Sequence, residues 1–213
     1  MSDVFIEGLS LLGLSLTEAV VQKEIDFLDE LLRWNQRVNL TSIRDRDEAI
    51  EKHLLDSLLL LLHLDDSKHI MDMGSGGGFP GIPLAIANPA LRVVSIDSVG
   101  KKINFQKHIK RLLQLDNLTI LQSRVEALEK TCLEKKYDLV VCRAFTSLEV
   151  AIKFASPWLT SGGRILAMKG PEGRDELRDA AGVLRQNEFD DPVVCSYHLP
   201  FSHAERQLLI LKK

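Results

Sequence analysis

The chain has 213 residues, of which 45% are hydrophobic and 27% are charged, and its formal net charge is -3 at pH 7. A chain of this length can bury a full core in one domain, and these fractions are ordinary for globular proteins, which excludes a disordered or fibrous class. The small acidic excess argues against a partner held by overall charge, although it leaves room for a local basic surface.

Residues 1–66 follow a helical period. An apolar stripe through 20–32 predicts an amphipathic helix, and the segment 15–18 supplies its N-terminal cap. The segment 34–41 is rich in turn-forming polar residues and ends this helix. A second helix is predicted over 47–62, so we expect an N-terminal helical extension ahead of the main domain.

Beyond this extension, residues 67–213 show short apolar runs that alternate with amphipathic stretches, as in β-α units that build a parallel sheet. Two final strand-like runs with only a short loop between them predict an antiparallel hairpin. This pattern favours an α/β, Rossmann-like class I methyltransferase domain with a seven-stranded, mostly parallel sheet over the six parallel strands of a dinucleotide dehydrogenase. The predicted strands cover 69–73, 92–97, 118–122, 137–142, 164–169, 192–199 and 206–212, and the predicted helices cover 81–88, 101–115, 147–159 and 174–187.

A glycine-rich segment, Asp72-Met-Gly-Ser-Gly-Gly-Gly-Phe-Pro-Gly81, joins the first predicted strand to a helix and holds five glycines. Glycines such as Gly74 and Gly76 let the backbone adopt positive φ and approach a ligand closely, and the helix start offers free N–H groups. A plain turn needs fewer glycines, because each one costs about 0.5–1 kcal/mol in chain entropy. The segment therefore predicts a ligand-binding loop.

Two cofactors compete for this loop. The spacing Gly76-x-Gly78-x-x-Gly81 fits the dinucleotide fingerprint of an NAD(P)-dependent oxidoreductase, although that fingerprint alone is a weak signal. Asp72 favours S-adenosylmethionine, because its carboxylate can organise the loop or meet the methionine ammonium, whereas it would repel a pyrophosphate. Asp97, which ends the second predicted strand, suits a ribose diol in either case.

His53, Asp56 and Ser57 share one face of the second predicted helix. Two possible ligands without a third are weak evidence for a metal, so we predict no metal site and expect these residues to brace the N-terminal helices against the sheet. Trp34 and Asn35 are expected to anchor the same junction. Stacking on RNA is the alternative for Trp34 if its indole is exposed.

The three cysteines, Cys132, Cys142 and Cys195, are too few and too scattered for a disulfide framework. The N-terminus carries acidic residues where a secretory signal needs basic ones, and the most apolar run, 58–62, is too short for a membrane span. We therefore expect a cytoplasmic protein with no membrane partner.

Several motifs occur together along residues 25–212. They are the glycine segment 72–86, Trp34-Asn35, Asn39-Leu40-Thr41, His53-x-x-Asp56-Ser57, Asp97-Ser98-x-x-Lys101-Lys102, Ser123-Arg124-Val125-Glu126, Arg143-Ala144, Lys169-Gly170 and Glu205-Arg206. In combination they resemble the RsmG (GidB) family of bacterial 16S rRNA methyltransferases, and they are far more specific than the glycine loop alone.

The resemblance implies that the chain transfers a methyl group from S-adenosylmethionine to N7 of a guanine in 16S rRNA of the small ribosomal subunit. It also implies that Gly74 and Phe79 line the methionine and ribose side of the cofactor, and that Val125 and Glu126 lie beside the adenine. Arg143 is then expected to complete the cofactor pocket and face the substrate.

Arg143 and Lys169 follow two predicted strands at the edge where open α/β sheets bind ligands. We predict both as catalytic residues that grip a phosphate or the guanine carbonyl oxygen, with Arg206 as a third substrate-binding residue, while salt bridges within the domain are the alternative. Guanine N7 carries a lone pair and no proton, so the reaction needs no general base. Alignment of the two reactants is expected to supply the catalysis.

The predicted helix 101–115 has a basic face, which is either a solvated surface or an RNA footprint. Its basic residues are Lys101, Lys102, Lys107, Lys110 and Arg111. We expect 16S rRNA or the small ribosomal subunit as partner, and a monomer. The alternatives are a methyltransferase for a small molecule or protein, an NAD(P)-dependent oxidoreductase, and a non-catalytic RNA-binding module.

Overall fold

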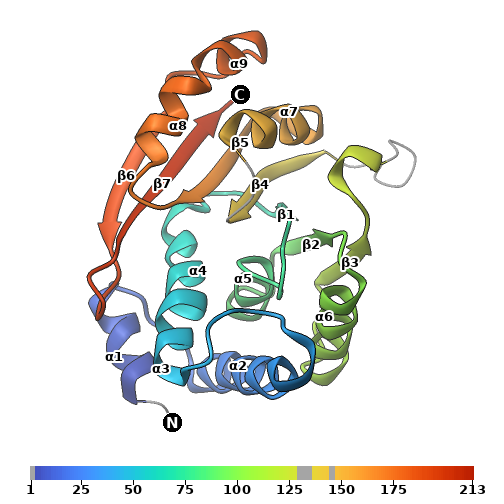
Figure 1. The fold of residues 1–213 in the computed structure, drawn as a ribbon, viewed down its shortest axis with the longest axis vertical. Coiled ribbons are helices and arrows are strands. Elements are labelled where there is room, and N and C mark those ends of the chain that lie inside the picture. Colours follow the sequence, from blue (N-terminus) through green and yellow to red (C-terminus); the bar gives the residue numbers. More distant parts are fainter. Residues whose placement is uncertain (1–2, 129–135, 144–146) are drawn as a thin grey trace.

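A computed structural model describes residues 3–128, 136–143 and 147–213, so Cys132 and Ala144 lie outside the described residues. A seven-stranded sheet runs through the molecule in the order β3-β2-β1-β4-β5-β7-β6, with helices on both of its faces (Figure 1). Strands β1 to β5 pair in parallel, and β7 is antiparallel to both β5 and β6. The predicted mixed sheet with a C-terminal hairpin is confirmed.

The strand bounds lie close to the predicted ones, with one exception. Strand β5 begins at Leu159 and not at 164, because the preceding helix ends at Ala155 and a 3-10 turn that contains Pro157 follows it. Proline lacks the N–H that would continue an α-helix, so residue 159 is free to enter the sheet. The strands are β1 His69–Met73, β2 Arg92–Asp97, β3 Leu118–Gln122, β4 Tyr137–Arg143, β5 Leu159–Lys169, β6 Val193–His198 and β7 Glu205–Lys212.

The helical segments are of three types, namely α, π and 3-10. The α-helices are α1 Asp3–Leu11, α2 Glu18–Val38, α3 Arg46–Ala49, α4 Asp56–Leu58, α5 Gly81–Ala87, α6 Gly100–Leu112, α7 Leu148–Ala155, α8 Gly173–Asp179 and α9 Ala181–Gln186. A π-helix, η1, covers Ile50–Leu55, and 3-10 helices cover η2 Leu59–His63, η3 Val125–Ala127 and η4 Ser156–Trp158. The helix predicted over 47–62 is therefore a continuous run of mixed type.

Helix ends differ from the predictions by a few residues. Helix α2 starts after Thr17, whose hydroxyl accepts a hydrogen bond from Val20 N, as predicted. The predicted end of α2 is wrong, because residues 34–38 are helical. The helix ends only at Asn39, which adopts a left-handed conformation with φ 46°. The helix predicted over 174–187 is divided at Ala180 into α8 and α9, and α1 was not singled out.

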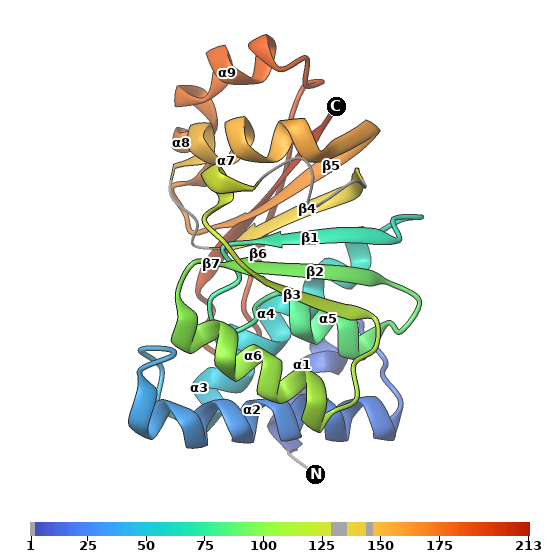
Figure 2. The ribbon, with the colours of Figure 1, turned by 90° about the vertical axis from the view of Figure 1, so that its right-hand side faces the viewer.

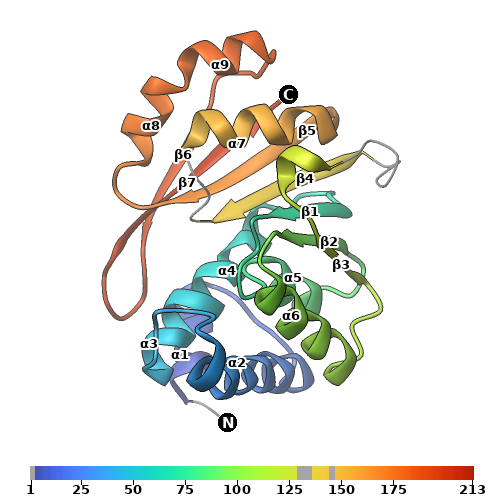
Figure 3. The same ribbon diagram turned by 45° about the vertical axis from the view of Figure 1, so that its right-hand side comes forward.

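Side chains of each strand alternate between two hydrophobic cores. In β4, Leu139 and Val141 point into a core shared with α1, α2, α5 and α6, whereas Val140 and Cys142 point into a core shared with α7 and α9. Figures 2 and 3 show these two groups of helices on opposite faces of the sheet. By the same alternation, Arg143 at the end of β4 lies on the face that carries the N-terminal helices.

The end of β5 has the opposite orientation. Leu166 and Met168 contribute to the first core, and Ile165 and Ala167 contribute to the second. Lys169 therefore lies on the face that carries α7, α8 and α9. The two cationic residues predicted at the strand ends reach the same edge of the sheet from opposite faces.

The N-terminal helices share the first core with the sheet. Phe27, Leu28 and Leu31 of α2 are fully buried in it, and the Phe27 ring lies 5.0 Å from the ring of Phe79. No helix in the described part of the chain has the length and apolar character that a bilayer crossing needs.

Glu24 of α2 is fully buried in this packing. Within the described residues, neither carboxylate oxygen has a hydrogen-bond partner. Burial raises the pKa of Glu24 well above its ordinary value of 4.5. Folding therefore favours the protonated form, and stability is lost as the pH rises above the ordinary pKa toward the folded-state pKa.

We predict that Glu24→Met stabilises the protein at pH 7 by about 1–3 kcal/mol, the cost of an unpaired buried polar group. Chemical denaturation of both proteins across pH 4 to 8 measures this effect. The gain should shrink toward pH 4, because there the wild-type carboxyl is protonated in both the folded and the unfolded state. A gain that does not change with pH would contradict the proposed origin.

Candidate active site

The loop after β1 turns sharply through three glycines. Gly74, Gly76 and Gly78 have φ values of +74°, +57° and +102°, which residues with a Cβ atom rarely adopt. The amides of Gly74 and Ser75 both donate to the carbonyl of Ile96, at 3.0 Å each. The loop is thus attached to the end of β2.

Asp72 lies beneath the loop and is fully buried. Its Oδ2 atom accepts a hydrogen bond from Gly81 N at 2.8 Å, and a Cβ atom on residue 81 would lie 2.6 Å from the same oxygen. Burial raises the pKa of Asp72 to about 7, although the bond from Gly81 N lowers it. Its Oδ1 atom has no partner among the residues that the structure describes. Asp72 therefore organises the loop, and one of its oxygens can still accept a donor.

Asp97 supports the loop from the end of β2. Its Oδ2 atom accepts from Gly76 N and its Oδ1 atom accepts from Val99 N, both at 2.8 Å. Each carboxylate oxygen has further lone pairs, so the side chain can accept additional hydrogen bonds from a ligand.

Gln106 of α6 joins the loop to the sheet, although the sequence analysis did not identify it. Its fully buried amide nitrogen donates to Ser75 Oγ at 2.8 Å and to Gly76 O at 2.9 Å, and its Oε1 atom accepts from Ser95 Oγ at 2.7 Å. The amide is therefore satisfied on both sides. A glutamine inside an otherwise apolar helix face was the available sequence signal.

A pocket of about 410 Å³ opens beside the loop, within the usual range for ligand sites. Four predicted cofactor residues, Gly74, Asp97, Val125 and Glu126, line it. The pocket lining does not include the other four predicted cofactor residues, which are Asp72, Gly76, Phe79 and Arg143. Residues that were not predicted complete the lining, and these are Ile96, Ser98, Val99, Lys102, Ser123 and Arg124.

A second hollow of about 460 Å³ lies at the ends of β4 and β5. The three predicted substrate-binding residues, Arg143, Lys169 and Arg206, all line it. Since β4 pairs with β1 on the side away from β2, this hollow and the pocket flank β1 at the same edge of the sheet. We call the pocket beside the glycine loop the loop pocket, and the hollow at the ends of β4 and β5 the cationic hollow.

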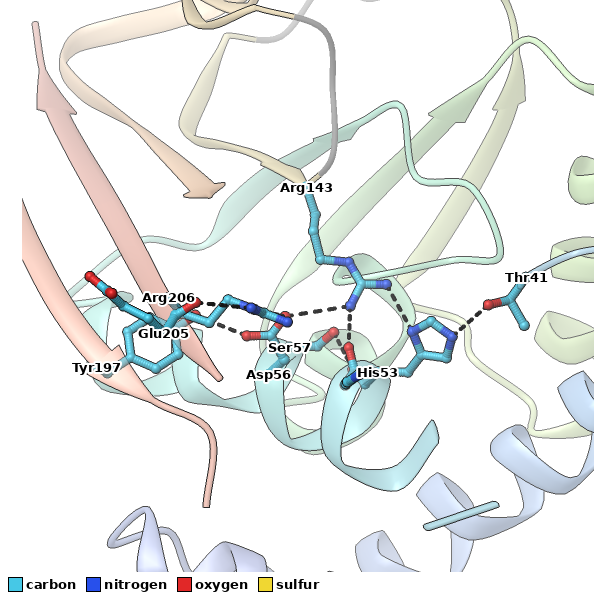
Figure 4. Close-up of polar contacts among 9 residues, drawn as sticks. Thr41, His53, Asp56, Ser57, Arg143, Tyr197, Glu205 and Arg206 are labelled. Carbon is cyan, nitrogen blue, oxygen red and sulfur yellow. Dashed lines mark hydrogen bonds and ion pairs between the residues drawn. The ribbon is translucent and has the colours of Figure 1, made fainter. Parts of the chain in front are cut away.

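The cationic residues have partners within the fold. Lys169 Nζ lies 2.7 Å from Glu176 Oε2, and Arg206 Nε lies 4.0 Å from Asp56 Oδ2. Arg143 donates to Lys52 O at 2.8 Å, and its guanidinium lies 3.7 Å from Asp56 Oδ2 (Figure 4). Burial lowers the pKa of Arg143.

Phe79 lies inside the molecule. Its ring stacks on His53 with a centroid distance of 4.6 Å, and the Arg143 guanidinium carbon lies 5.0 Å from the ring centroid. Phe79 therefore joins the glycine loop to the N-terminal helices. Its expected contact with the cofactor stays a prediction.

The residues expected to brace the N-terminal helices make such contacts. Trp34 packs edge-on against Phe105 of α6 at 5.5 Å, and Asn35 accepts hydrogen bonds from Leu40 N and Thr41 N at 2.7 and 3.0 Å. Asp56 Oδ1 accepts from Tyr197 OH at 2.9 Å, which joins α4 to β6.

The basic residues of α6 are not equivalent. Lys102 lines the loop pocket, and Lys110 donates to the carbonyl of Leu118. The other three, Lys101, Lys107 and Arg111, are exposed. The helix therefore begins at the loop pocket, and its cationic side chains continue away from it.

The strand order with its antiparallel C-terminal hairpin is the Rossmann-like fold of class I methyltransferases. An O-methyltransferase from Bacillus cereus in complex with SAH has the same fold, with a TM-score of 0.63 at 13% sequence identity over 88% of this chain and 91% of that chain.

The sequence relationship is closer. The family model GidB, rRNA small subunit methyltransferase G, matches residues 21–208, and the chain belongs to this family. The ribosomal RNA small subunit methyltransferase G of Syntrophotalea carbinolica is 43% identical over 100% of this chain and 98% of its own length. The protein of the same name from Aromatoleum aromaticum is 42% identical over 97% of this chain and 96% of its own length. The chain is thus a methyltransferase, and the oxidoreductase alternative is set aside.

We predict that Gln106→Leu lowers stability by about 1–3 kcal/mol, because it leaves buried groups of the loop and of Ser95 without partners. Denaturant unfolding measures the change. Asn104→Leu, which replaces an exposed amide of the same helix, is the matched control and should leave stability within about 0.5 kcal/mol. Equal effects of the two substitutions would contradict the role of the buried amide.

Proposed function

We propose that this chain transfers the methyl group of S-adenosylmethionine to N7 of a guanine in 16S rRNA. The observation that carries the proposal is the position of the loop pocket and the cationic hollow on either side of β1. A cofactor in the first and a nucleotide in the second would meet at the end of that strand. The names of the family and of its relatives support the ribosomal substrate.

The residues of the loop pocket fit the proposed cofactor. The Asp97 carboxylate suits the ribose diol, and Val125 with Glu126 provides an apolar and a polar group for the adenine. The glycine backbone at Gly74 suits the methionine end of the cofactor, and the buried Asp72 carboxylate holds this loop in place through Gly81 N. When bound, S-adenosylmethionine supplies an electrophilic methyl group on a sulfonium.

The cationic hollow fits a guanine nucleotide. Arg143 and Lys169 are proposed as catalytic residues that hold the guanine carbonyl oxygen or a phosphate, with Arg206 as a further contact. Because N7 bears a free lone pair, no residue has to remove a proton. The contribution of the protein is alignment, which supplies up to roughly 7–11 kcal/mol in favourable cases.

Methyl transfer from radiolabelled S-adenosylmethionine tests the proposal. Small ribosomal subunits, free 16S rRNA, ribosomal protein and a metabolite extract serve as separate acceptors. We expect label in 16S rRNA, in the free or the assembled form, and mass spectrometry of nuclease digests should show 7-methylguanosine. Label confined to protein or metabolites would refute the RNA assignment and support the small-molecule or protein alternative.

We predict that Asp97→Ala weakens binding of S-adenosylmethionine by about 1.5–3 kcal/mol, or roughly 10- to 150-fold in Kd, because charge-assisted hydrogen bonds are lost. Isothermal titration calorimetry measures the affinity. Asp116→Ala, an exposed acidic position beyond α6, is the matched control and should bind as the wild type does. Unchanged affinity in Asp97→Ala would place the ribose elsewhere.

A further inference from the structure

A chain of polar contacts joins the N-terminal helices to the end of β4 (Figure 4). Arg143 NH1 donates to Lys52 O at 2.8 Å, and Arg143 NH2 lies 3.3 Å from His53 Nδ1. On the other side of the ring, His53 Nε2 lies 2.9 Å from Thr41 Oγ1. His53 is thus held at both nitrogens, between a loop of the N-terminal segment and a residue of the cationic hollow.

The partners determine the tautomer of His53. A guanidinium has only donors, so the ring nitrogen facing Arg143 must accept, and the hydrogen is on Nε2. Nε2–H then donates to Thr41 Oγ1, which also accepts from Ile43 N at 3.2 Å. Burial, with a smaller contribution from the charge of Arg143, lowers the pKa of His53 to about 3, so the ring is neutral at pH 7.

Neighbouring backbone groups hold both ends of this series of polar contacts in place. Thr41 is held by Asn35, whose Oδ1 atom accepts from Thr41 N. At the end of the π-helix η1, the amide of Asp56 donates to the carbonyls of Glu51 and His53. It does not donate to Lys52 O, which would be its acceptor in a regular α-helix. That carbonyl accepts from Arg143 instead. π-helical turns are frequent at functional sites, and here the turn frees an acceptor.

The same histidine also contributes packing. Its ring stacks on Phe79 at an interplanar angle of 19°, and Arg143 covers Phe79 at 5.0 Å. The Arg143 side chain is 18% exposed and lines the cationic hollow. Its remaining freedom is therefore limited by Lys52 O, the His53 ring and the Phe79 face.

We propose that His53 is a positioning residue, which acts as a neutral hydrogen-bond acceptor and holds the Arg143 guanidinium in the orientation that meets the methyl acceptor. This inference rests on the proposed function, because it takes Arg143 as a contact of the RNA. It assigns to the N-terminal helical segment a part in acceptor binding, through Thr41, Lys52 O and His53.

The test compares substitutions that separate packing from hydrogen bonding. His53→Phe keeps a ring to stack on Phe79 but removes both nitrogens, and His53→Asn places an amide oxygen near the position of Nδ1. We expect His53→Phe to lower kcat/KM for the ribosomal substrate by about tenfold or more, the effect of one lost hydrogen bond to a charged group. The Kd for S-adenosylmethionine should change by less than about twofold. His53→Asn should recover part of the activity.

Two further measurements test the inference even if His53→Phe or His53→Asn does not fold. Nitrogen-15 NMR of histidine-labelled wild type should show the neutral Nε2–H tautomer of His53 at pH 7. Thr41→Val should lower kcat/KM for the ribosomal substrate, because His53 Nε2–H then loses its hydrogen-bond partner. The Kd for S-adenosylmethionine should stay unchanged. His63→Phe, in η2 and outside the lining of the cationic hollow, is the matched control and should behave as the wild type does.

Several results would overturn the inference. These are an imidazolium or an Nδ1–H tautomer at His53, wild-type kinetics in His53→Phe, or a loss of cofactor affinity in step with the loss of acceptor turnover, which would indicate a merely structural role. A wild-type chain that transfers no methyl to ribosomal RNA would overturn the proposed function and, with it, the acceptor role of His53. Normal wild-type turnover with an unaffected His53→Phe variant would overturn this inference alone.

Discussion

The hydrogen bond from Gly81 N to the buried Asp72 carboxylate holds the start of α5 against the end of β1. The approach is so close that residue 81 has no room for a Cβ atom. Because α5 is held there, the glycine loop must turn back within a few residues, and its backbone lies at the sheet edge. Asp97 and Gln106 support the loop in this position. The position of the loop beside the pocket therefore rests on this contact together with the supports from Ile96 O, Asp97 and Gln106.

The order of the strands determines what lies on either side of the loop. Strands β2 and β3 extend from β1 in one direction, and β4 and β5 extend in the other. Open α/β sheets bind ligands at such a reversal of strand order. On the first side, the carboxylates of Asp97 and Glu126 line the loop pocket. On the second side, Arg143 and Lys169 line the cationic hollow together with their carboxylate partners Asp56 and Glu176.

The N-terminal helices complete the second side. Alternation along β4 directs Arg143 toward the face that these helices cover, and Lys52 O and His53 meet it there. The continuous packing of Phe27, Phe79 and His53 connects the helices to the glycine loop. The helical segment thus contributes groups to the site as well as covering the hydrophobic face of the sheet.

Local patterns in the sequence determined much of this protein. The strands 69–73, 92–97 and 118–122, the glycine loop and the carboxylate at Asp97 follow from burial, backbone geometry and spacing over a few residues. Only the tertiary structure decided which distant groups meet. His53 and Arg143 are 90 residues apart, and Gln106 contacts Gly76 over 30. A hydrogen bond between such residues leaves no periodic trace in the chain, because its partners are selected by the packing of whole elements and not by neighbours in sequence.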